Sequence, residues 1–140
     1  MNTKTVKTFN ANIYIAGDIS RIRDICGEYC ESGFCVSITS TEFVYTYGRE
    51  TGAIIGIINY PRFPKQQKEI KKLSILLSEK LITGLHQGSC TIVFTDETVF
   101  ISRRPEDEGY LRESNYIKNV INGLSDEALH ALDRAVKENK

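Results

Sequence analysis

Long apolar runs are missing from this chain of 140 residues. No stretch approaches the roughly 18–20 apolar residues that a membrane-spanning helix needs. The first residues, MNTKTVKTFNAN, are polar and lack the apolar segment of a secretory signal. The sequence therefore predicts a cytoplasmic protein with no membrane partner. In that compartment its four cysteines are expected to stay reduced.

Net charge is also absent, because 18 basic side chains balance 18 acidic ones. Proteins that bind nucleic acid through its phosphates normally carry a clear basic excess. Nucleic acid is therefore not expected as a partner, and the basic helix face of Lys65, Lys68, Lys71 and Lys72 is interpreted as solvated. Zero net charge also removes repulsion between copies, which favours a homo-oligomer.

Groups suited to acid–base or metal chemistry are few. The two histidines, His86 and His130, are not predicted to lie among polar partners at a strand end. Cys26 and Cys30 are one helical turn apart, which favours packing against a core over zinc binding. We therefore predict no metal ion, no cofactor and no catalytic residue.

What the chain does contain is a regular succession of strand and helix patterns. Hairpins separate the helices, which predicts an α+β fold with a mixed, largely antiparallel sheet of five to six strands, two long helices and a helical C-terminus. We expect a single domain over 1–140, with residues 1–10 flexible and C-terminal helices over 110–140. Strands are predicted over 12–16, 34–39, 41–47, 53–58, 90–95 and 98–102, a turn over 48–52, and helices over about 18–33 and 65–85. The runs 34–39 and 41–47 are either two strands or one bent strand.

The segment 53–65, AIIGIINYPRFPK, is the most informative part of the sequence. Residues 53–58 predict a strand buried on both faces, and therefore central in the sheet. The loop that follows is stiffened by two prolines and carries an amide, two aromatic rings and a guanidinium. A rigid loop at the carboxyl end of a central strand is a common place for a ligand to bind.

These side chains match the needs of a nucleotide: a ring for stacking, an amide for a base edge and an arginine for phosphate. Two further arginines end the last predicted strand and would add charge if the two strand ends are neighbours. We therefore predict a ligand site composed of Asn59, Tyr60, Arg62, Phe63, Arg103 and Arg104. In the alternative interpretation Tyr60 and Phe63 pack on the second helix, and Arg62 forms an ion pair.

Several short stretches resemble known proteins. The YIAG at 14–17 is similar to the opening strand of nucleoside deoxyribosyltransferase-like proteins, where it begins the nucleotide site, but the hairpin-rich order departs from that fold. Together, YIAGD, IRDICGEYC, CVSITST, YTYG and IIGIINYPRFP resemble small bacteriophage-encoded proteins over roughly residues 12–103. Some phage proteins of this size are anti-defence sponges of the Thoeris anti-defence type. That resemblance implies a viral protein of the host cytoplasm that sequesters a cyclic nucleotide signal without cleaving it.

From the loop and this resemblance we predict non-catalytic binding and sequestration of a small phosphorylated, cyclic nucleotide in phage counter-defence, without enzyme activity. Two alternatives stay open. The first is a protein-interaction module that blocks a host protein through the aromatic strand face of Phe43, Tyr45 and Tyr47. The second is an enzyme that acts on nucleosides, with Glu42 or Glu50 as its carboxylate.

Overall fold

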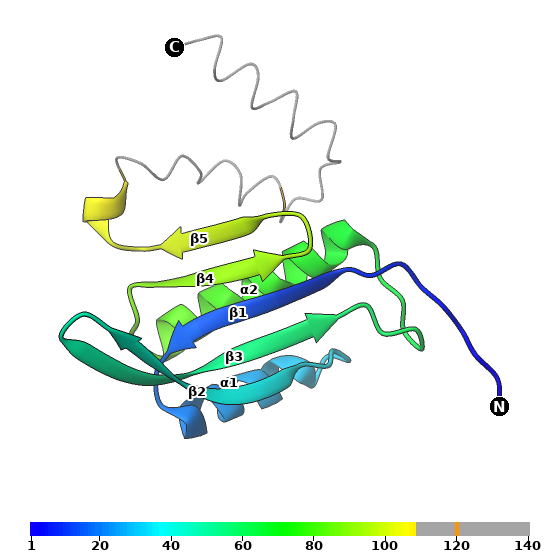
Figure 1. The fold of residues 1–140 in the computed structure, drawn as a ribbon, viewed down its shortest axis with the longest axis horizontal. Coiled ribbons are helices and arrows are strands. Elements are labelled where there is room, and N and C mark those ends of the chain that lie inside the picture. Colours follow the sequence, from blue (N-terminus) through cyan, green and yellow to red (C-terminus); the bar gives the residue numbers. More distant parts are fainter. Residues whose placement is uncertain (109–119, 121–140) are drawn as a thin grey trace, which may run out of the picture.

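The computed structural model describes residues 1–108 and 120. Five strands form one sheet and two long helices pack on one of its faces (Figure 1). This arrangement confirms the predicted α+β class, and the predicted helices over 110–140 lie outside the described residues. The strands are β1 (Asn10–Ala16), β2 (Ser37–Tyr45), β3 (Gly48–Ile58), β4 (Ser89–Phe94) and β5 (Thr98–Ser102), and the helices are α1 (Ile19–Cys30) and α2 (Gln67–Gly84), followed by a 3₁₀ turn over Pro105–Asp107.

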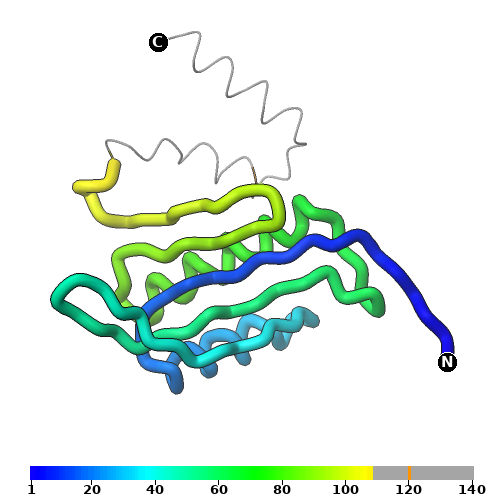
Figure 2. The backbone as a smooth tube through the Cα atoms, in the orientation of Figure 1, coloured from blue at the N-terminus to red at the C-terminus, as the bar shows by residue number. Residues whose placement is uncertain are grey.

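The strand order is β2-β3-β1-β4-β5, and each neighbouring pair is antiparallel. Strands β1, β2 and β5 therefore run in one direction, and β3 and β4 run in the other (Figure 2). The carboxyl ends of β3 and β5 consequently lie at opposite ends of the sheet. This topology decides which loops can meet and which cannot.

The core lies between the sheet and the helices, on one face of the sheet only. Alternate residues of each strand point to that face, because the side-chain period of a strand is two. On the other face of β3, Ile54 is half-buried and Ile58 is 48% exposed. The prediction that 53–58 is buried on both faces is therefore wrong, since the helices cover one face only, although β3 is an interior strand between β2 and β1. The covered face of β1 and β3 consists of Ala11, Ile13, Ile15, Ala53, Ile55 and Ile57, and the helices contribute Ile22, Ile25, Cys26, Ile70, Ile75, Leu77 and Leu81.

Strands β2 and β3 form a long hairpin whose turn lies at 46–47. The two runs 34–39 and 41–47 contribute to one strand, and the predicted turn over 48–52 is part of β3. Tyr47 adopts a positive φ of 66°, which allows the tight turn. A Cβ atom at Gly48 would lie 2.4 Å from the Tyr45 ring. This glycine therefore makes room for an aromatic ring inside a strand, where the sequence pattern predicts a turn.

Helix α1 begins at the predicted place. The Oδ1 atom of Asp18 accepts a hydrogen bond of 3.1 Å from the backbone N–H of Ser20, which satisfies a free donor of the first turn. The helix ends at Cys30, and Gly33 adopts a positive φ of 100° in the turn that follows. Among the described residues, no helix combines the length and the apolar character needed to cross a bilayer.

Lys71 is a correction to the predicted solvated face of α2, because this residue is only 8% exposed. Its Nζ atom lies 2.9 Å from Oδ2 of Asp96 and 3.2 Å from Oε1 of Glu97, in the β4–β5 turn. The aliphatic stem passes through the edge of the core, and the ammonium lies 5.6 Å from the centroid of the Phe94 ring. Lys71 thus ties α2 to the β4–β5 hairpin.

Candidate functional site

Asn59, in the loop after β3, uses its side-chain amide to hold the loop in place. It is 8% exposed. Its Nδ2 donates to the carbonyl oxygen of Lys7 at 2.8 Å, and its Oδ1 accepts from the backbone N–H of Lys65 at 2.8 Å. Because both polar atoms are paired inside the chain, the amide is not available to read the edge of a base.

The other side chains of this loop are solvent-facing or engaged nearby. Tyr60 is half-buried, and a hydrogen bond with Cys35, together with partial burial, raises the pKa of Tyr60. The Arg62 guanidinium lies 5.7 Å from the centroid of the Phe63 ring, and Phe63 is 65% exposed. Among the described residues Arg62 has no acidic partner. Within residues 1–108 and 120, the alternative ion pair of Arg62 is therefore not seen.

The two arginines after β5 lie at the opposite end of the sheet from this loop. Arg103 Nε donates to the carbonyl oxygen of Gln87 at 2.7 Å, and Arg104 Nη1 donates to Ser89 Oγ at 3.2 Å. The six predicted site residues therefore do not gather in one place. Whether the loop residues or the two arginines bind a ligand stays a prediction. Within one chain, however, the loop and the arginines cannot form one site.

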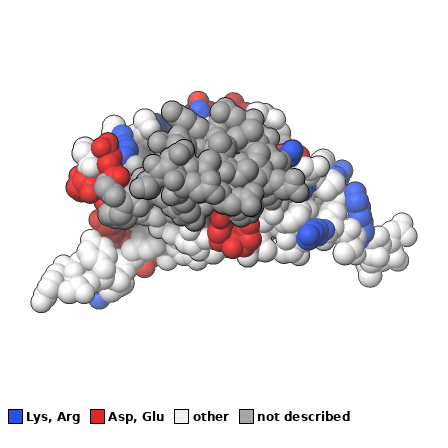
Figure 3. Space-filling model, turned by 90° about the horizontal axis from the view of Figure 1, so that it is seen from above, with Lys and Arg blue, Asp and Glu red and all other residues white. Residues whose placement is uncertain are grey.

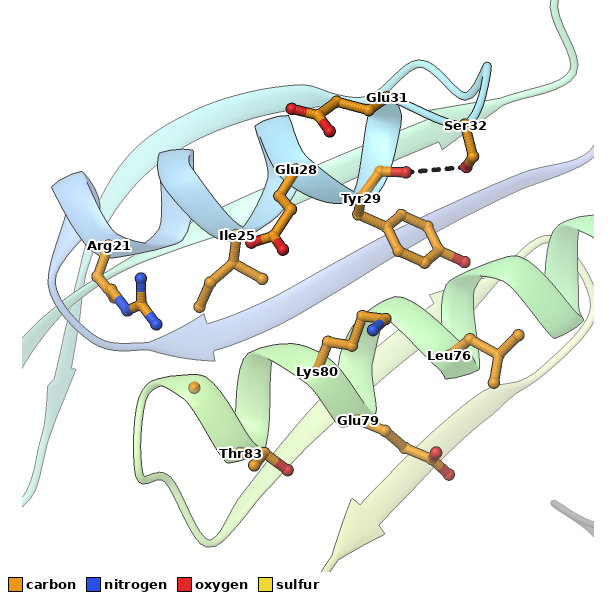
Figure 4. A pocket seen from close by; sticks show the side chains of 11 residues that line it. Arg21, Ile25, Glu28, Tyr29, Glu31, Ser32, Leu76, Glu79, Lys80 and Thr83 are labelled. Atoms are coloured by element: carbon orange, nitrogen blue, oxygen red, sulfur yellow. Dashed lines mark hydrogen bonds between the residues drawn. The ribbon is translucent and has the colours of Figure 1, made fainter.

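A groove of about 1040 Å³ runs between the two helices, and Figure 4 shows the side chains that line it. Arg21 and Glu28 come from α1, and Lys80 comes from α2, so that charges of both signs line the groove. The Tyr29 hydroxyl donates to the carbonyl oxygen of Leu73 at 3.0 Å and links the helices. Because the lining charges are exposed and the Tyr29 hydroxyl is already hydrogen-bonded, we interpret this groove as the packing boundary between the two helices.

The described part of the chain shows no metal site, and its two buried thiols are unreactive. Within residues 1–108 and 120, no group of His, Cys, Asp and Glu side chains is arranged to hold a metal ion. Burial raises the pKa of the Cys26 and Cys90 thiols to about 11. Both thiols are therefore protonated at neutral pH and are poor nucleophiles.

The face of the sheet that the helices leave uncovered carries a different set of side chains. No described helix or strand lies over it (Figure 1). Residues directly opposite each other in antiparallel strands share a face. The strand registers therefore place one continuous row across all five strands, with Tyr14 at its middle and 36% exposed. This row is Thr39, Ile54, Tyr14, Thr91 and Phe100.

At the hairpin end of the same face, a carboxylate lies between aromatic rings. Phe43 is the Cα partner of Glu50. A Cβ atom at Gly52 would lie 2.7 Å from the Phe43 ring, so this ring lies across Gly52. In the same way, the Tyr45 ring lies across Gly48. Partial desolvation and the Glu50 carboxylate, which accepts a hydrogen bond from the Tyr45 hydroxyl, raise the pKa of Tyr45. We call Phe43, Tyr45 and Glu50 the hairpin cluster.

The hairpin places the two glutamates considered in the sequence on opposite faces. Glu42 Oε1 lies 3.4 Å from Arg49 Nη1 in an ion pair whose side chains are 50% and 75% exposed. Glu50 alone faces the aromatic rings. Alternation along β2 places Glu42 on the face opposite Phe43 and Tyr45, but only the register of the hairpin places Glu50 on the face of those rings.

The protein is therefore an α+β protein with one antiparallel sheet, and the uncovered face of this sheet presents the carboxylate and the aromatic rings of the hairpin cluster. Rings and a carboxylate are the groups that bind an organic cation. The site therefore suits a small, positively charged organic molecule better than a phosphorylated one.

Comparison with known proteins identifies solved structures with a similar fold. No protein-family model and no curated protein matches this sequence. A phage SAM lyase in complex with S-methyl-5′-thioadenosine matches with a TM-score of 0.58 and 15% identity, over 73% of this chain and 95% of that one. A phage SAM lyase in its apo state also matches with a TM-score of 0.58, at 16% identity over 69% of this chain and 90% of that one. At such identity the likeness establishes the fold.

These neighbours correct two predictions. They are enzymes, and one of them holds a small nucleoside, so the predictions of a non-catalytic sponge and of no enzyme activity are overturned in favour of the nucleoside-processing alternative. The neighbours are also phage proteins, which agrees with the predicted resemblance to phage-encoded proteins, although the Thoeris sponge type is not confirmed. The physical reason for the error is that the loop chemistry suggested phosphate, whereas the cluster on the sheet suggests a cation.

Proposed function

We propose that this protein is a lyase that cleaves S-adenosylmethionine (SAM), a nucleoside with a positively charged sulfonium centre. The observation that supports this proposal is the hairpin cluster of Phe43, Tyr45 and Glu50, on a fold shared with phage SAM lyase. The scarcity of metal-ligating and histidine side chains in the sequence is compatible with this proposal, because this reaction needs neither a metal ion nor a histidine.

The chemistry follows from the substrate. SAM carries a methyl, a 5′-adenosyl and an aminocarboxypropyl group on sulfur, and S-methyl-5′-thioadenosine remains when the last of these leaves. Without water, the carboxylate oxygen of that group attacks its own γ carbon and the carbon–sulfur bond breaks. The bonding pair stays on sulfur, which becomes a neutral thioether, and the amino acid leaves as a lactone. The enzyme must mainly hold the chain folded for this attack.

The cluster can do this from the uncovered face of the sheet. Glu50 would bind the α-ammonium of the substrate and so fix the position of the neighbouring carboxylate. The Phe43 ring, which lies across Gly52, would face the sulfonium. The Tyr45 hydroxyl, whose pKa partial desolvation and the nearby Glu50 carboxylate raise, would help to position that carboxylate.

We also propose that copies of the chain associate. Three side chains near the hairpin turn are exposed: Val44 by 68%, Tyr45 by 53% and Tyr47 by 104%. Figure 3 shows a largely uncharged projection at the end of the molecule where the hairpin lies in Figure 1. Burial of these side chains against a second copy would remove apolar surface from water.

A phage-encoded protein in the host cytoplasm would meet SAM there.

The decisive experiment incubates purified protein with SAM and identifies the products by chromatography and mass spectrometry. We expect S-methyl-5′-thioadenosine and a lactone that base opens to homoserine. Glu50→Gln should lower the rate by about 10²-fold because the substrate is no longer held in position. Glu42→Gln, the control on the opposite face, should leave the rate unchanged. Intact SAM after incubation with folded wild-type protein would contradict the proposal, and so would equal rates for the two variants.

A further inference from the structure

Asn12 is an unusual residue for the middle strand of a sheet, because asparagine is disfavoured in strands. It lies on the uncovered face, opposite Gly56 on β3 and Val93 on β4, and it is half-buried. Within residues 1–108 and 120, its side-chain amide makes no hydrogen bond. A partly buried amide without partners is unfavourable in the free chain. A ligand that pairs with the amide would offset that cost.

The Ser37 hydroxyl lies across Gly56, beside this amide: a Cβ atom at Gly56 would lie 2.5 Å from Ser37 Oγ and 3.6 Å from Asn12 Oδ1. Tyr14 follows two residues later on the same face, about 7 Å along the strand. A free amide and an exposed ring at this separation match a planar heterocycle that stacks on the ring and presents its edge to the amide.

We propose that Asn12 and Tyr14 form an adenine-binding subsite on the uncovered face of the sheet. The ring of Tyr14 stacks on the base. The Oδ1 atom of Asn12 accepts from the N6 amino group of adenine while its Nδ2 donates to N7, the bidentate pair that an asparagine forms with this base. The inference rests on the proposed function in one respect: the adenine is that of SAM.

The spacing along β3 is consistent with one ligand that reaches from this subsite to the hairpin cluster. Gly56, the partner of Asn12, and Glu50 are six residues apart, which is about 20 Å between Cα atoms. Between them lies Gly52 with the Phe43 ring across it, so that ring would contact the middle of such a ligand.

The contrast with Asn59 supports this assignment. Both polar atoms of the Asn59 amide are paired with backbone groups at 2.8 Å, so that residue has a structural role that is visible in the chain. Asn12 has the same amide, and in the part of the chain that the structure describes it has no such partner. Its removal should therefore affect binding of a base without loss of stability.

The test measures binding of S-methyl-5′-thioadenosine and S-methyl-5′-thioinosine to the full chain by calorimetry. Inosine replaces the N6 amino group by an oxygen, which one asparagine cannot satisfy together with N7. We expect the wild type to prefer the adenosine form about 10-fold or more. Asn12→Leu should abolish this preference and bind the adenosine form about 10-fold more weakly, with an unchanged or higher melting temperature. The control Thr98→Val, which removes a hydroxyl from an edge strand of the same face, should leave both affinities unchanged.

A second variant keeps the test decisive if Asn12→Leu does not fold. Tyr14→Leu should weaken binding of both nucleosides by about 10-fold and preserve the preference, because stacking does not depend on the base edge. Undiminished preference in Asn12→Leu overturns the subsite, and so does a wild type that binds neither nucleoside. Failure of the lyase is a separate result, since a protein that leaves SAM intact can still bind the adenosine form through Asn12.

Discussion

The two faces of this sheet are made by the same strands but have opposite chemistry. Alternate residues of β1 send Ile13 and Ile15 into the core, fully or almost fully buried, and Asn12 and Tyr14 to the uncovered side. On the covered face, each apolar group has a partner within the chain. On the uncovered face, rings are exposed, and the Asn12 amide has no hydrogen-bond partner among the described residues. The comparison shows that the side chains that stabilise the fold lie on the covered face, and that the rings and the amide that a ligand could contact lie on the uncovered face.

The largest effect on the free energy of unfolding is expected from a comparison of two neighbouring isoleucines of β3. Ile55 is fully buried on the covered face, and Ile54 is half-buried on the other. Ile55→Ala should lower the free energy of unfolding by about 2–5 kcal/mol, because it leaves a cavity that the core cannot close. Ile54→Ala should cost about 1 kcal/mol or less. Urea unfolding of both variants measures the difference, and equal losses would mean that the two faces are packed alike.

The next effect concerns Lys71, the buried cation of the covered side. Burial alone would lower the pKa of Lys71, but hydrogen bonds to Asp96 and Glu97 and their charges outweigh it and raise the pKa. Lys71→Met should cost about 1–3 kcal/mol at neutral pH, because the hydrogen bonds from the ammonium to Asp96 and Glu97 are lost.

The pH dependence of this effect has a definite sign. A pKa raised in the folded state contributes stability that is fully present below the ordinary value of 10.5 and is lost as pH rises through the folded value. The gap between wild type and Lys71→Met should therefore be constant from pH 7 to 10 and narrow above pH 10.5. Denaturant unfolding across this range measures it, and narrowing near pH 8 would contradict the assignment.

A smaller effect is expected at the start of α1, which covers the sheet. Asp18→Ala removes the acceptor for the Ser20 N–H and should cost about 1 kcal/mol. Ser20→Ala is the matched control, since the bond uses the Ser20 backbone and should survive. Thermal unfolding compares the two variants. A loss in the control as large as in Asp18→Ala would show that the capping bond is not what stabilises the helix start.

The smallest effect is a gain on the outer side of the same helix. A Cβ atom at Gly27 would meet no heavy atom within 4 Å, so Gly27→Ala should stabilise the fold by about 0.5–1 kcal/mol through helix propensity alone. At Gly84, the last residue of α2, a Cβ atom would lie 2.7 Å from Ile25 Cδ1. Gly84→Ala should therefore gain less or lose stability. Chemical unfolding can resolve this difference, and an equal gain at both positions would contradict the packing described for Gly84.

Local patterns in the sequence were sufficient for much of the fold. The strand before Gly17, the cap at Asp18 and the β4–β5 hairpin all depend on residues close together in the chain. The errors arose where distant segments meet. The turn predicted over 48–52 is a strand because rings of β2 lie across the glycines of β3, and no local pattern reports that contact.

The candidate site was less predictable than the fold. A proline-stiffened loop with polar side chains resembles a ligand site, yet its Asn59 is paired with Lys7 and Lys65, and Lys7 is remote in sequence. Glu50 was one of two carboxylates considered, but only the register of the hairpin separates it from Glu42.

By itself, the sequence determined the class of fold and most of its elements, because hydrophobic periodicity and caps act over a few residues. The tertiary structure decided which face stays uncovered, which glutamate faces aromatic rings, and that the loop after β3 and the arginines after β5 lie at opposite ends. The physical reason is that these outcomes depend on strand order and direction, which arise from packing between segments tens of residues apart.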